Sequence, residues 1–142
     1  MNNKTIKLSN NINLIGFNSD LDTYKKFHKL GLNKKIILDN INKIDLKKYN
    51  IMIAHNPLEF DSYVESKVDL VLSGHVHGGL ARLPIIGGLL SPDYTFFPKY
   101  DFGMYIKDRT RMIVSRGIGY CKYIPFRIFN PGEVVIIDLI KD

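Results

Sequence analysis

Two short apolar runs on either side of a helical segment constrain the fold of this chain more than any other feature. Residues 51–54 (IMIA) and 69–72 (DLVL) are too short for helices and are followed by turn-forming residues. Between them, Asn56 precedes Pro57, which is favourable at a first helical position, and the helix should reach about Ser66. Such a unit has parallel strands whose C-terminal ends meet at one rim, where open α/β sheets place ligands.

The other segments extend this unit into a mixed α/β sheet. Residues 5–8 and 12–17 suit a hairpin, and helical spacing predicts helices from Asp20 to Gly31 and from about 33 to 48. The glycine- and proline-rich segment 78–99 is expected to be an irregular functional loop. The last third should be antiparallel, with strands at 103–107, 111–115, 127–129 and 134–139.

Three of the four histidines lie at the predicted strand ends. His55 ends the first apolar run, and His75 and His77 follow the second in the segment SGHVHGG. Residues two apart in an extended segment face the same way, so these three rings can converge on a divalent metal ion. A satisfied structural histidine is the alternative, and it is the interpretation that we keep for His28, which lies among lysines.

Composition excludes several classes of protein. The chain has 142 residues, of which 45% are hydrophobic, as expected for one globular domain. Cys121 is the only cysteine, which rules out an internal disulfide and a thiolate zinc cluster. Apolar stretches such as 83–90 are broken by proline and glycine, so no transmembrane helix is predicted. Residues 1–10 contain no apolar h-region, so no secretory signal is predicted on this chain as given. We therefore expect a cytoplasmic protein or one that is peripheral at a membrane.

The net charge of +6 does not indicate nucleic-acid binding. Residues 1–50 contain ten lysines and four acidic residues, whereas residues 51–142 contain ten basic and ten acidic residues. The excess is therefore confined to the first third, which contains no arginine, the residue best suited to read phosphates and bases. A solvated basic surface is the simpler interpretation, and no nucleic-acid partner is expected.

Several segments in this order resemble the C-terminal half of the calcineurin-like metallophosphoesterases, in particular a bacterial, membrane-associated branch. The Gly-His-x-His core is moderately specific by itself, and the ordered set is much more so. The segments are IMIAHNPLEF, DLVLSGHVHGGLARLP, SPDYTFFPKYDFGMY, SRGIGY and PFRIFNPGEVVIIDL.

The resemblance implies a two-metal phosphoester hydrolase built as a four-layer α/β/β/α sandwich. It implies that His55 and His75 bind one divalent ion and His77 the other, with Mn, Fe, Zn or Co as candidates. Asn56, Arg116, Arg127 and the backbone near Gly78 and Gly79 are candidate contacts to the substrate phosphate. A helix cap, strand-end ion pairs and a tight turn explain these residues as well.

The chain departs from the family pattern in one respect. The Asp-x-His, Gly-Asp-x-x-Asp and Gly-Asn-His-Asp/Glu motifs of the family's N-terminal half are absent from residues 1–142. We therefore predict one partial metallophosphoesterase domain that holds at most one metal by itself and requires a partner chain for activity. The alternatives are an inactive truncated fragment and a non-catalytic metal-binding or interaction module.

Two apolar surfaces are expected. Residues 83–90, with Phe96 and Phe97, form a loop that either dips into a membrane interface, in keeping with a lipid-linked phosphoester substrate, or covers the core. A half-sandwich should also expose one face of its sheet, with residues such as Ile51, Ile53 or Val71, and should self-associate.

Overall fold

A computed structural model describes residues 3–18, 44–92, 94–119 and 127–140. Its main feature is a mixed sheet in the order β1-β2-β3-β4-β8-β7. The strands are β1 (Lys4–Lys7), β2 (Ile12–Phe17), β3 (Tyr49–Ala54), β4 (Leu70–Ser73), β7 (Gly103–Lys107) and β8 (Thr110–Val114). The four inner strands are parallel to one another, and the two edge strands are antiparallel to their neighbours.

The predicted strand–helix–strand unit forms as expected. The 3-10 helix η2 (Pro57–Glu59) leads into helix α2 (Phe60–Glu65), and both connect the parallel strands β3 and β4. The Asn56 side chain accepts a hydrogen bond from the Leu58 amide at 3.0 Å, which caps the first turn. The helix ends at Ser66, because Lys67 has a φ of 62° that a helix cannot continue.

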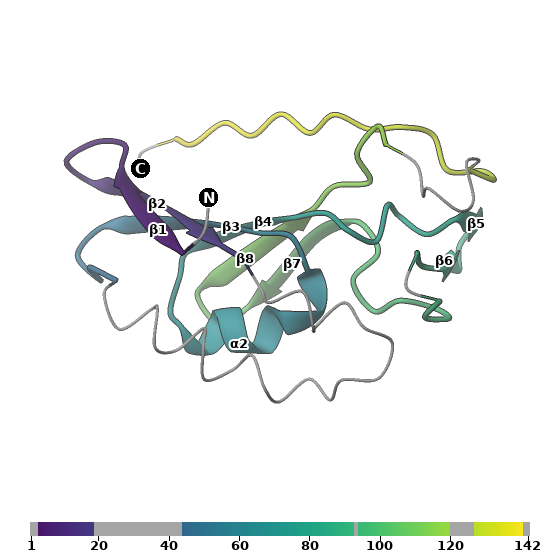
Figure 1. Cartoon of the computed structure of the whole chain (residues 1–142), viewed down its shortest axis with the longest axis horizontal. Helices are drawn as coiled ribbons and strands as arrows, with labels where there is room; N and C mark the ends of the chain where they lie inside the picture. The colour runs from purple at the N-terminus through teal and green to yellow at the C-terminus, as the bar shows by residue number, and fades with distance from the viewer. Residues whose placement is uncertain (1–2, 19–43, 93, 120–126, 141–142) are drawn as a thin grey trace.

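The core lies between the sheet and this helix. Met52, Val71 and Met112, which come from neighbouring strands and point to the same face, are fully buried. Helix α2 lies below the sheet in Figure 1, and its Phe60 and Tyr63 belong to the same buried cluster. The opposite face lies beneath the C-terminal segment 127–140, which crosses above the sheet in yellow in Figure 1.

The exposed-face prediction is correct for Ile53 only. Ile53 is 42% exposed, but Ile51 and Val71 are buried. Val71 pairs with Met52 and so points to the helix-covered face, on which its side chain joins the core. The apolar face that remains exposed continues through Met104 and Ile106 of β7.

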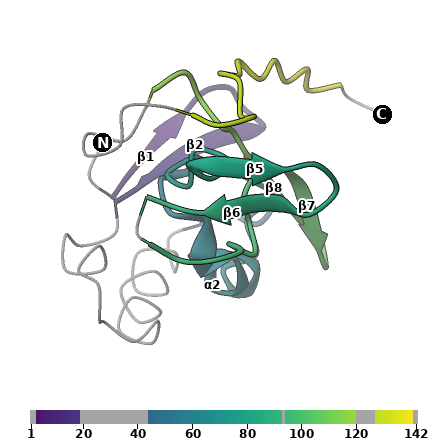
Figure 2. The same ribbon diagram turned by 90° about the vertical axis from the view of Figure 1, so that its right-hand side faces the viewer.

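Several other sequence expectations need correction. The irregular segment 78–99 contains a hairpin of β5 (Ala81–Leu83) and β6 (Gly87–Leu90), which projects at the front of Figure 2. Residues 44–48, the end of the second predicted helix, form a turn, while 33–43 and the helix predicted from Asp20 to Gly31 lie outside the described residues.

The last two predicted strands do not form. Residue Ile128 makes a single bridge to Ala81, and 134–139 is in no strand of the described structure. This segment passes over the face of the sheet rather than along an edge (Figure 1), so its β-branched residues have no ladder to join. The last third is antiparallel only between β7 and β8, because β8 also pairs in parallel with β4.

Candidate metal centre

The candidate site lies where the parallel strands end. His55 follows the last residue of β3, and His75 lies two residues beyond the end of β4. The Ser73 hydroxyl donates to the Ala54 carbonyl at 2.6 Å, and the Gly74 amide donates to the His55 carbonyl at 3.2 Å. These two hydrogen bonds keep the strand ends in register beyond the ladder.

His55 and His75 face each other across this rim. The distance from His55 Nε2 to His75 Nδ1 is 3.1 Å, and the ring centroids are 4.9 Å apart. Burial lowers the pKa of His55, which favours the neutral imidazole that metals bind. Two ligands at about 2.0–2.1 Å from a tetrahedral ion lie roughly 3.3 Å apart, so this nitrogen separation suits two ligands of one metal.

His77 has different surroundings. Its Nδ1 lies 3.5 Å from Arg127 Nη2, and its carbonyl accepts a hydrogen bond from Asn130 at 2.6 Å. Burial lowers the pKa of His77, and the charges of Arg127 and His55 lower it further. The structure therefore brings two of the three predicted ligands together and places the third against a guanidinium.

A crevice of about 540 Å³ opens beside the pair, lined by the ends of three parallel strands. Gly16 and Phe17 come from β2, Ala54 from β3, and Ser73 from β4. This is the rim at which the sequence predicted a ligand site.

The imidazole donors at this rim would complete only part of a metal site. Within the described residues no group of three or more His, Cys, Asp or Glu side chains could hold a metal ion. His55 and His75 supply two imidazole nitrogens, and further ligands must come from elsewhere.

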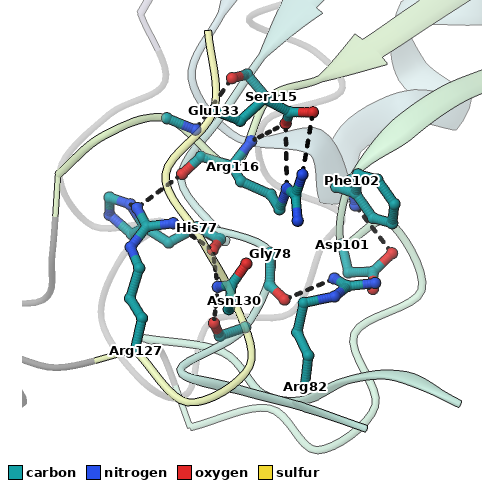
Figure 3. Close-up of polar contacts among 12 residues, drawn as sticks. His77, Gly78, Arg82, Asp101, Phe102, Ser115, Arg116, Arg127, Asn130 and Glu133 are labelled. Atoms are coloured by element: carbon teal, nitrogen blue, oxygen red, sulfur yellow. Dashed lines mark hydrogen bonds and ion pairs between the residues drawn. The ribbon is translucent and has the colours of Figure 1, made fainter. Parts of the chain in front are cut away.

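The predicted substrate contacts have structural partners. Asn56 caps η2, and Gly78, with a φ of +72°, has its carbonyl bound by Arg82 at 2.8 Å. The Arg116 guanidinium forms an ion pair with Glu133 at 3.3 Å and stacks over the Phe102 ring, 4.8 Å from its centroid (Figure 3). The cap, turn and ion-pair interpretations therefore account for the contacts observed at these three residues.

The sequence interpretation missed three residues around residues 75–79, which we call the histidine loop. Asp101 binds Arg82 at 2.8 Å, Glu133 binds Arg116, and Asn130 binds the carbonyls of His77 and Gly79 (Figure 3). Asp101 lies in the segment YDFGMY, and Asn130 and Glu133 lie in FNPGE. A charged or amide side chain close to glycine or proline was the one sequence signal that could have indicated their roles.

Comparison with known proteins shows what the chain is similar to. The uncharacterized metallophosphoesterase YkuE of Bacillus subtilis is 30% identical over 99 residues, which is 70% of this chain and 34% of that protein. The uncharacterized metallophosphoesterase Cj0846 of Campylobacter jejuni is 36% identical over 68% of this chain and 25% of its own length. The chain is therefore similar to part of two proteins named metallophosphoesterases.

Other relatives carry related names. The phosphodiesterase YaeI of Escherichia coli is 28% identical over 63% of this chain and 32% of its own length. The chain thus spans about a quarter to a third of the length of these curated relatives. No protein-family model matches the chain, and no solved structure matches it. Among the described residues, no helix combines the length and apolar character needed to cross a membrane.

Proposed function

We propose that this chain is the C-terminal portion of a metal-dependent phosphoester hydrolase. His55 and His75 would hold one divalent ion, and His77 would hold a second. The observation that carries this proposal is the 3.1 Å separation of His55 Nε2 and His75 Nδ1 at the C-terminal ends of two adjacent parallel strands. Similarity to proteins named metallophosphoesterases and phosphodiesterase supports the reaction class.

The chemistry of the site sets what else it needs. A pair of divalent ions would supply an activated water and stabilise the charge that develops on the phosphoryl oxygens. Three neutral imidazoles cannot offset the repulsion between two dications, so a bridging carboxylate is required. We infer that residues carrying the three absent family motifs supply it, either on another chain or in a longer form of this one.

The apolar face of the sheet also fits a larger fold. In a four-layer sandwich a second sheet would pack on the face that bears Ile53, Met104 and Ile106, over which segment 127–140 now passes (Figure 1). These three side chains are 42%, 61% and 62% exposed. Strand register places Ile53 and Met104 in one row across the sheet, through Leu72 and Ile113. An apolar row of this kind is what a packed second sheet buries.

For the substrate we propose a phosphoester attached to a lipid. The hairpin of β5 and β6 exposes Ile85 and Ile86 at its tip, and Phe96 and Phe97 are exposed beside β6. Exposed aliphatic and aromatic side chains of this kind suit the interface of a bilayer, and a peripheral location would follow. Co-sedimentation with anionic vesicles that is lost in Ile85→Ser/Ile86→Ser would support this part of the proposal; equal sedimentation of both proteins would contradict it.

A non-catalytic metal-binding module is the second candidate. It is favoured by the finding that the described residues contain no complete set of three metal-binding side chains. This candidate requires one bound ion and no turnover under any condition.

A reconstitution experiment separates the two. Bound metal and the hydrolysis of an aryl phosphodiester and an aryl phosphomonoester are measured on this chain alone and after addition of an N-terminal metallophosphoesterase half that carries the three motifs. We expect turnover only in the mixture and its loss in His77→Ala. Metal binding without turnover in the mixture would favour the non-catalytic module.

A further inference from the structure

The loop from His75 to Gly79 has an unusual backbone. His75 and His77 have φ angles of 62° and 54°, and Gly78 and Gly79 have φ angles of 72° and 87°. Left-handed φ values are uncommon for residues other than glycine, and they persist where the surrounding structure holds them. Contacts from the surrounding structure must therefore hold this loop in its conformation.

Side chains from later in the chain bind three consecutive carbonyl groups of the loop. Asn130 Nδ2 donates to the carbonyls of His77 and Gly79, at 2.6 Å in each case. Arg82 Nη1 donates to the Gly78 carbonyl between them at 2.8 Å, and Arg127 Nη1 adds a contact of 3.4 Å to the His77 carbonyl (Figure 3).

Asn130 lies at the centre of this arrangement. It is 2% exposed, and its Oδ1 is buried with no hydrogen-bond partner among the described residues. That atom lies 2.9 Å from the position that a Cβ on Gly78 would occupy. The amide nitrogen alone can donate to two carbonyls at once, so the position of Asn130 is explained by those two hydrogen bonds.

We propose that Asn130 is a positioning residue for the metal-binding loop. By holding the carbonyls on both sides of Gly78, it fixes the direction in which the His77 side chain leaves the backbone. It also stabilises the turn that presents His75 to His55. This inference rests on the proposed function, in which these histidines bind metal, and it adds a residue outside the ligand set.

Asn50 provides a matched control at the opposite end of the sheet. It is fully buried, and its Nδ2 also donates to two carbonyls, those of Asp45 at 3.1 Å and Lys48 at 2.7 Å. It lies near the start of β3, whereas the candidate ligands follow the ends of β3 and β4. Asn50→Ala therefore removes a comparable pair of donated hydrogen bonds, together with the bond that Asn50 Oδ1 accepts from Asn13 at 3.2 Å, without touching the loop.

The experiment compares Asn130→Ala and the shape-matched Asn130→Asp with Asn50→Ala in the full chain. Amide hydrogen exchange of residues 76–80 is measured without metal, and Zn²⁺ affinity is measured by calorimetry. We expect faster exchange in both Asn130 variants and Zn²⁺ binding weaker by about 10–100-fold, the usual cost of losing a group that orients ligands. Asn50→Ala should leave both quantities unchanged.

Two results would overturn the inference. One is unchanged exchange of residues 76–80 in Asn130→Asp, the variant that keeps the shape of the side chain. The other is an equal loss of Zn²⁺ affinity in Asn50→Ala, which would indicate a general effect of stability. Failure of the unsubstituted chain to bind Zn²⁺ even after addition of the N-terminal half would instead overturn the proposed function, and the exchange comparison would still decide whether Asn130 fixes the loop.

Discussion

The Asp101 carboxylate accepts a hydrogen bond from Arg82 Nη1 at 2.8 Å, and the same arginine nitrogen donates to the Gly78 carbonyl at 2.8 Å. Asp101 also accepts from the Gly88 amide at 2.9 Å. One carboxylate therefore connects the β5–β6 hairpin to the histidine loop through an arginine, and both partners of the ion pair are mostly buried.

This ion pair predicts a specific dependence of stability on pH. Burial by itself raises the pKa of Asp101, but hydrogen bonds from Gly88 and Phe102 and the charge of Arg82 outweigh it, so the pKa lies below its ordinary value of 3.8. A lowered pKa contributes stability that is present above 3.8 and is lost as the pH falls through the value in the folded protein.

The variant Asp101→Asn tests this contribution. We expect it to reduce the free energy of unfolding at pH 7 by about 1–3 kcal/mol, because Arg82 loses a charged acceptor. The difference from the unsubstituted chain should shrink as the pH falls below about 4. Urea unfolding at a series of pH values measures both effects; a difference that is constant down to pH 2 would contradict the assignment.

Gly78→Ala should be more damaging than a substitution at another left-handed glycine. A Cβ on Gly78 would lie 2.5 Å from Arg116 Cγ and 2.9 Å from Asn130 Oδ1, whereas nothing lies within 4 Å of one on Gly117, whose φ is +61°. Both alanine variants bear similar backbone strain, so crowding should cost Gly78→Ala about 1–3 kcal/mol more. Equal losses in thermal or urea unfolding would show that the packing around Gly78 relaxes freely.

The role of Asn56 can be separated from metal binding. Its side chain caps η2 through the Leu58 amide, so Asn56→Ala should cost about 1 kcal/mol of stability and leave Zn²⁺ affinity unchanged. Asn56→Ser, which can still cap, should recover most of that stability. A loss of metal affinity in both variants would contradict a role of Asn56 that is confined to the cap.

The exposed sheet face predicts self-association of the isolated chain. Met104 and Ile106 are 61% and 62% exposed on the face that bears Ile53. Light scattering should show concentration-dependent oligomers that diminish in Met104→Lys/Ile106→Lys. Leu8→Lys, which changes a residue of similar exposure (56%) next to β1, is the control. A stable monomer at all concentrations would contradict this expectation.

Local sequence patterns predicted the parts of the fold that local chemistry determines. The pair of apolar runs around Asn56-Pro57 predicted β3, α2 and β4, because burial and a proline-tolerant helix start are local signals. The strands predicted at 103–107 and 111–115 likewise correspond to the hairpin of β7 and β8. The residues 134–139 were wrongly predicted as a strand, since a strand also needs a neighbouring edge, which sequence alone does not specify.

The candidate site was predictable to a similar extent. The spacing of His55 and His75 beyond two parallel strands allowed their convergence to be expected, and the structure places their nitrogens 3.1 Å apart. The contact of His77 with Arg127 could not be predicted, because it joins residues 50 positions apart in the sequence. The bonds from Asn130 to the loop carbonyls were missed for the same reason.

The most direct test of the metal site is a titration of this chain with Co²⁺, followed by its visible absorption spectrum, which reports the ligands of the bound ion. We predict a saturable spectrum with imidazole ligands that is lost in His55→Ala and in His75→Ala and is retained in His28→Ala. The same spectrum in His55→Ala/His75→Ala as in the unsubstituted chain would contradict metal binding by this pair.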